Sequence, residues 1–172
     1  MTSTLAAKQC KHMRRNAISK VSRAFVGYEG PMKYRHEAHG WFYESEGYQI
    51  ARDLLELHPE EIDYDDVIRP IDGSLLPSWS SNEGLMWLLP GIVGLVFQVD
   101  PLKGDYLFQS LLTELERRVS SGELDLTEDQ VMALLSVHEE LYCSEYFRWN
   151  PAAHMHPFCR SLREIIGDST EG

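Results

Sequence analysis

The longest apolar run of the chain, residues 85–97, lies in a segment that reads WSSNEGLMWLLPGIVGLVFQV from Trp79 to Val99. Its apolar residues fall on nearly every side of a helix, which predicts a helix that is buried on most sides. Ser80 and Glu83 have the spacing of a capping box, so we expect the helix to begin just after Ser80. Pro90 lacks a backbone donor and predicts a kink. This segment is interpreted as the buried central helix of a mostly α domain.

Other segments also carry apolar residues at helical spacing. The pattern predicts helices over residues 11–26, 46–57, 103–120 and 127–143, and shorter helices over 59–67 and 157–166. The last long helix opens with a capping box formed by Thr127 and Gln130. In the helix over 103–120, six apolar residues are expected to face inward: Tyr106, Leu107, Leu111, Leu112, Leu115 and Val119.

These helices together predict a mostly α, compact multi-helix protein. A length of 172 residues suits one domain, and we predict a single domain over 1–172 with five or six helices. Residues 1–10 and 168–172 are expected to be flexible. Residues 32–45 are rich in aromatic side chains and predict either a loop or one short hairpin.

Charge is distributed unevenly along the chain. The net charge is −11, but residues 1–35 hold eight basic residues against Glu29, a charge of +7, which leaves −18 on the rest. Nine acidic residues lie between Glu44 and Asp66. Such a surface repels nucleic acid and anionic membranes and attracts basic proteins. A solvated acidic face that only aids solubility is the simpler alternative, and the basic N-terminal helix is likewise expected to present a solvated face.

Cysteine content and the N-terminus bear on location. The chain has three cysteines, an odd number and too few for a disulfide framework. This count favours a reducing compartment. The N-terminal residues hold no apolar stretch of secretory length, and no run approaches the ~20 residues of a membrane span. We therefore expect a cytoplasmic protein that binds neither membrane nor nucleic acid.

Two groups of residues could carry metal or catalytic chemistry. Cys143, His154, His156 and Cys159 offer thiolate and imidazole ligands for zinc, but their spacing matches no known zinc motif. His36 and His39 lie among aromatic residues, where histidines are usually structural. The chain lacks the glycine-rich phosphate loop, the dinucleotide fingerprint and the serine-hydrolase elbow. We therefore predict no metal, no cofactor and no catalytic residue.

Three segments together resemble one protein family. They are AFVG from Ala24, followed by Pro31; SNEG from Ser81 leading to WLLPG from Trp87; and LTEDQV from Leu126, followed by Leu141. This order is similar to that of a group of small, acidic, uncharacterised bacterial proteins classed as a domain of unknown function. Some members are suspected immunity proteins encoded near secreted toxins.

The resemblance covers about residues 18–143 and leaves 144–172 as a C-terminal extension. This chain departs from the family pattern in having His36 and His39 where cysteines are frequent, and Asn82-Glu83 where Pro-Glu is usual. The family has no established catalytic residues, so the resemblance assigns none here.

The resemblance and the acidic charge together predict a non-catalytic binding protein. It would be an immunity protein or inhibitor that neutralises a basic toxin domain through an acidic surface. The partner-binding residues are predicted to be Glu60, Glu61, Asp63, Asp65 and Asp66, with Tyr64 as an aromatic anchor. The alternatives are a small metal-binding protein or enzyme that uses the loop His and Cys residues, and a regulatory adaptor unrelated to toxins.

Overall fold

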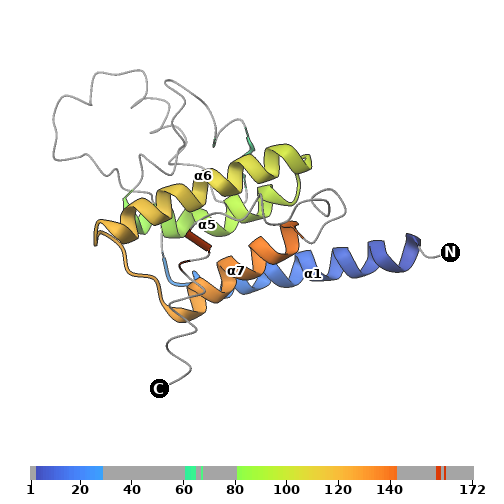
Figure 1. Cartoon of the computed structure of the whole chain (residues 1–172), viewed down its shortest axis with the longest axis horizontal. Coiled ribbons are helices and arrows are strands. Elements are labelled where there is room, and N and C mark those ends of the chain that lie inside the picture. Colours follow the sequence, from blue (N-terminus) through green and yellow to red (C-terminus); the bar gives the residue numbers. More distant parts are fainter. Residues whose placement is uncertain are drawn as a thin grey trace. The chain divides into compact units, whose positions relative to one another are not determined.

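The computed structural model describes residues 3–28, 61–64, 67, 81–142, 158, 159 and 161. In this part the backbone forms four helices and no strand (Figure 1). They are α1 (Ser3–Ala24), α5 (Asn82–Val96), α6 (Pro101–Ser120) and α7 (Glu128–Tyr142). The prediction of a mostly α protein is thus confirmed for the described residues. The predicted helix over 46–57 and the predicted hairpin or loop over 32–45 lie outside them.

The chain divides into two compact units. The first combines residues 1–24 with 115–172, and the second comprises residues 25–114. Helix α6 contributes its last turns to the first unit and its earlier turns to the second. Among the described residues, no helix has an apolar stretch that could cross a membrane.

In the first unit, α1 and α7 lie side by side (Figure 1). Ala17 and Val21 of α1 are buried, and α7 buries a face that includes Val131, Leu134, Leu135, His138 and Leu141. Helix α1 begins at Ser3, earlier than the predicted start at residue 11, and it ends at Ala24. Gly27 follows with φ of +94°, a conformation that glycine adopts without strain.

The junction between α6 and α7 follows local hydrogen-bonding rules. The amides of Gly122 and Glu123 donate to the carbonyls of Val119 and Arg118, at 3.0 and 2.9 Å, and Gly122 has φ of +71°. These two bonds form a Schellman motif, which satisfies the last carbonyls of α6. The predicted capping box at the start of α7 is confirmed. Gln130 N donates to Thr127 Oγ1 at 3.3 Å, and Thr127 N donates to Gln130 Oε1 at 3.0 Å.

In the second unit, α5 begins one residue later than predicted. The N-cap is Ser81, not Ser80, because Ser81 Oγ accepts a hydrogen bond from Gly84 N at 3.1 Å. The prediction was wrong because Ser80 and Ser81 are adjacent, and the capping-box spacing to Glu83 favoured Ser80. With Ser81 as the cap, Glu83 lies in the first turn, where its charge complements the helix dipole.

The burial of α5 matches the apolar pattern of its sequence. Nine of its residues are buried: Gly84, Leu85, Met86, Leu88, Leu89, Ile92, Val93, Leu95 and Val96. Pro90 lies inside the helix, which ends at Val96, three residues before the predicted end.

Helix α6 begins at Pro101, just after an acidic cap. Asp100 Oδ1 accepts hydrogen bonds from Leu102 N and Lys103 N, both at 3.1 Å. One turn later, Gly104 lies against Val96, the last residue of α5. A Cβ at position 104 would collide with the carbonyl oxygen of Val96. Only glycine allows the two backbones to approach this closely.

The inner face of α6 matches the prediction at four of its six positions, and a fifth, Val119, is half-buried. Leu107, Leu111, Leu112 and Leu115 are buried as expected, and Phe108 is fully buried as well. Tyr106, in contrast, is 51% exposed, so its prediction as an inward residue was wrong. The physical reason is its place on the helix, since Tyr106 lies on the side opposite Phe108 and Leu111.

Candidate functional site

Three of the six predicted partner-binding residues belong to the described part of the chain. Glu61 and Asp63 are exposed and Tyr64 is half-buried, whereas Glu60, Asp65 and Asp66 lie outside the described residues. Ile62 is buried, and so is Val67, whose amide donates to Asp63 O at 3.3 Å across a helical turn. The two apolar side chains hold this segment in place while the carboxylates of Glu61 and Asp63 face solvent.

A cation–π contact joins this acidic segment to α6. The Nζ atom of Lys103 lies 4.8 Å from the centroid of the Tyr64 ring, within the range of a favourable interaction. Figure 1 shows the short coloured segment around residue 63 beside the N-terminal half of α6. The predicted acidic segment and the first turns of α6 therefore form one surface.

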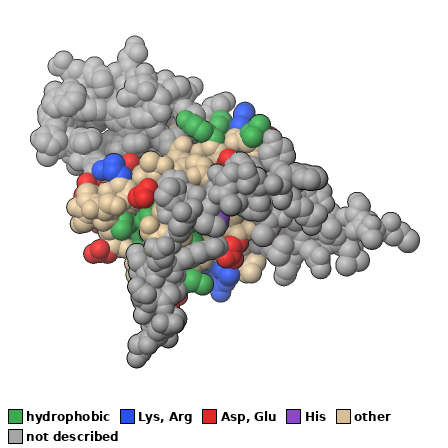
Figure 2. Space-filling model, viewed as in Figure 1, with side chains coloured by type: hydrophobic (Ala, Val, Ile, Leu, Met, Phe, Trp, Pro, Cys, Tyr) green, Lys and Arg blue, Asp and Glu red, His purple; other side chains and the backbone are tan. Residues whose placement is uncertain are grey.

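Two large apolar side chains are exposed on these first turns. Leu102 is 61% exposed and Tyr106 is 51% exposed. They are four residues apart, so they lie next to each other on one face of the helix. Figure 2 shows hydrophobic side chains beside a basic one at the upper edge of the described surface, over this part of α6. An exposed leucine alone would be ordinary, but a leucine beside a tyrosine offers a contiguous apolar contact.

We call this region the acidic–apolar surface. Its members are Glu61, Asp63, Tyr64, Leu102, Lys103 and Tyr106. Asp100 is also exposed and Asp105 is half-buried on the same turns of α6, so carboxylates outnumber the single Lys103 ammonium here. An apolar centre with a charged edge is the usual arrangement of a protein-binding surface. Tyrosine is among the residue types that contribute most to binding energy.

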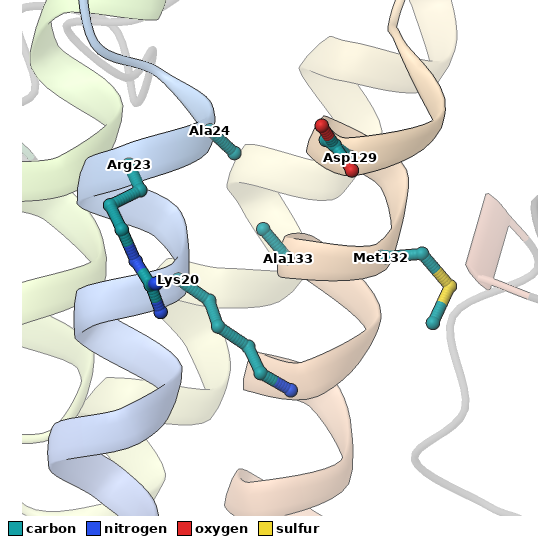
Figure 3. Close-up of a pocket in the computed structure, with 6 residues that line it drawn as sticks. All are labelled: Lys20, Arg23, Ala24, Asp129, Met132 and Ala133. Atoms are coloured by element: carbon teal, nitrogen blue, oxygen red, sulfur yellow. The ribbon is translucent and has the colours of Figure 1, made fainter.

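The first unit holds a separate, open groove between α1 and α7 (Figure 3). Its volume is about 340 Å³, and its lining consists of Lys20, Arg23, Ala24, Asp129, Met132 and Ala133. The two alanines leave the space that larger side chains would fill. In Figure 3 the Lys20 side chain reaches across toward α7, and the Asp129 carboxylate lies near the opposite end of the groove. The groove thus has basic, acidic and apolar parts.

A buried carboxylate lies elsewhere between the same two helices. Glu140 Oε1 is 3.9 Å from Arg14 Nε, and neither atom makes a hydrogen bond. The Glu140 side chain is only 5% exposed, whereas that of Arg14 is 43% exposed. Burial raises the pKa of the Glu140 carboxyl, and the Arg14 charge offsets part of this rise. On the same helix, His138 is buried with its ring 4.6 Å from that of Tyr142.

Of the residues that the sequence offers as metal ligands, Cys159 alone belongs to the described part of the chain. Cys159 is buried, while Cys143, His154 and His156 lie outside the described residues, as do His36 and His39. Within the described ranges, no three His, Cys, Asp or Glu side chains are grouped so that they could hold a metal ion.

Sequence reasoning missed the apolar half of the acidic–apolar surface and the whole groove. A signal for the former existed, because Leu102 and Tyr106 are apolar residues at i and i+4 on the polar side of α6. The groove had no such signal, since it depends on how α1 packs against α7.

No family model, curated protein or solved structure matches the chain.

Proposed function

We propose that this protein is a non-catalytic binding protein that docks a basic partner protein on the acidic–apolar surface. The observation that carries the proposal is the Lys103–Tyr64 contact, because it joins the segment that holds Glu61 and Asp63 to the turn of α6 that exposes Leu102 and Tyr106. Apolar anchors supply most of the binding energy of such a site. The surrounding carboxylates speed association with a basic surface and disfavour acidic competitors.

The charge of the whole chain supports the same kind of partner. The −18 carried by residues 36–172 creates a long-range field that attracts a basic protein before contact. Toxin domains that act on nucleic acid need basic clefts, because such clefts neutralise phosphates. More specifically, we propose that this chain is an immunity protein that covers the basic cleft of a bacterial toxin, as the family resemblance implies.

A pair of matched charge reversals tests the proposal. The first variant carries Glu61→Lys and Asp63→Lys, and the control carries Asp125→Lys and Glu139→Lys, which change the net charge equally at exposed sites of the other unit. Each protein is immobilised, and binding of the product of the neighbouring open reading frame is measured alongside proteins captured from the native host.

We expect the first variant to lose binding to a partner that the wild type and the control still bind. Equal loss in both variants would mean that overall charge, rather than this surface, governs binding. Retention of the partner by the first variant would remove the acidic segment from the interface.

A further inference from the structure

The α1–α7 groove has a lining that the acidic–apolar surface does not explain. Lys20 and Arg23 are three residues apart on α1, so their side chains extend on the same side of the helix. Both are exposed, and Lys20 has no ion-pair partner among the described residues. Arg23 Nε donates to Ser19 O at 3.3 Å, and its two terminal nitrogens make no hydrogen bond to a residue of the described ranges. The α1 wall therefore offers two cations to an anion.

The α7 wall offers different chemistry. Ala133 and the half-exposed Met132 are apolar, and the flexible thioether of methionine adapts to varied apolar partners. Asp129 adds a carboxylate near one end of the groove, which offers a ligand hydrogen-bond acceptors and repels anions (Figure 3). A free inorganic anion would contact only the α1 wall and would be opposed by Asp129. Such an ion would leave the apolar part of the lining unused.

An extended peptide with an acidic side chain matches all three parts of the lining. Its carboxylate would meet Lys20 and Arg23, a neighbouring apolar side chain would contact Met132, and a backbone amide would donate to Asp129. The volume of about 340 Å³ is at the small end of ligand pockets, which span roughly 300–1,000 Å³. It suits a few residues of a peptide rather than a folded domain.

From this geometry we infer that the α1–α7 groove binds a short acidic–apolar peptide segment of a partner protein. The site is independent of the acidic–apolar surface and has the opposite charge preference. It also gives a binding role to the basic N-terminal helix, whose exposed charges the proposed toxin interface does not use.

Amide-detected NMR tests this inference on the full-length protein. The probe is the peptide Ac-Leu-Glu-Leu-NH₂, and the matched neutral probe is Ac-Leu-Gln-Leu-NH₂. The acidic peptide should cause saturable shifts confined to the amides near residues 20–24 and 129–133. The neutral peptide and an equal concentration of inorganic phosphate should bind at least about tenfold more weakly, because each lacks one part of the recognised pattern.

Variants separate the groove from general basicity. Lys20→Gln with Arg23→Gln should weaken peptide binding at least about tenfold, and Met132→Ser should weaken it as well. Arg15→Gln is the control, since Arg15 is exposed on α1 but does not line the groove. The inference is overturned if the acidic peptide gives no saturable shifts, if phosphate binds as well as the peptide, or if Arg15→Gln weakens binding as much as the double variant.

Discussion

Gln130 Nε2 donates a hydrogen bond to the backbone carbonyl of Ala24 at 3.3 Å, across 106 residues of sequence. The same side chain closes the capping box of α7 through its Oε1 atom, which accepts from Thr127 N. The Gln130 side chain is buried, at 3% exposed, and both bonds are partly buried. One residue thus starts α7 and ties it to the C-terminal end of α1.

This dual role predicts that Gln130→Glu is destabilising although it preserves the capping box. A glutamate keeps the acceptor for Thr127 N but has no donor for Ala24 O, and it places a carboxylate near that carbonyl. We expect a loss of about 1–3 kcal/mol in the free energy of unfolding, measured by urea denaturation at neutral pH. If Gln130→Glu is as stable as the wild type, the bond to Ala24 contributes nothing.

The contact between Gly104 and Val96 predicts opposite effects at two glycines. Gly104→Ala would force its methyl group against a backbone oxygen, and overpacking of this kind costs about 1–3 kcal/mol. At Gly94, the one described atom that an added Cβ would meet is Gln98 Nε2, at an ordinary 3.7 Å. Gly94→Ala should therefore be neutral or stabilise the protein by up to about 1 kcal/mol, through helix propensity.

Thermal unfolding of the two alanine variants checks this pair. Equal melting temperatures for Gly104→Ala and Gly94→Ala would contradict the close approach of α5 and α6 at Val96. The comparison is internal, because both substitutions add the same methyl group to a helix.

Glu140 predicts a pH dependence of stability. Because burial raises its pKa in the folded state, the folded protein holds this proton at pH values where the unfolded chain has lost it. The folded state then binds more protons, so this carboxyl lowers stability as pH rises from near 4.5, the ordinary value, through the raised pKa. Glu140→Gln should remove that decline and leave stability at neutral pH equal or higher, since water can solvate the partly exposed Arg14.

Urea denaturation of Glu140→Gln across the acid range measures this effect. Asp125→Asn is the control, because it removes a carboxylate from an exposed loop. A large loss of stability in Glu140→Gln at neutral pH would show instead that the ion pair with Arg14 stabilises the α1–α7 contact.

Local rules predicted much of the described fold. The capping box of Thr127 and Gln130, the end of α6 at Ser120 and most of the buried side chains of α5 and α6 follow from near neighbours in sequence. Tertiary relationships did not follow, since neither the bond from Gln130 to Ala24 nor the approach of Gly104 to Val96 has a local signal. The sequence could not show whether Ser80 or Ser81 is the N-cap, because the two serines are adjacent and the backbone geometry selects between them.

The candidate site was predictable in part. The acidic segment around Asp63 stands out by composition, but its neighbour on α6 depends on the Lys103–Tyr64 contact, which joins segments about forty residues apart. Tyr106 was assigned to the core by its apolar character, although its position opposite Phe108 places it at the surface. The groove required the packing of α1 on α7, which no single segment encodes.

The central claim is that Tyr106 anchors a partner protein on the acidic–apolar surface. The most direct test is calorimetric measurement of affinity for the captured partner, comparing wild type, Tyr106→Ala and Val26→Ala. Val26 is 77% exposed and lies outside the surface, so it serves as the apolar control. We predict that Tyr106→Ala weakens binding at least about thirtyfold, the effect of losing an anchor worth about 2 kcal/mol, while Val26→Ala binds as the wild type does. Wild-type affinity in Tyr106→Ala would contradict the account.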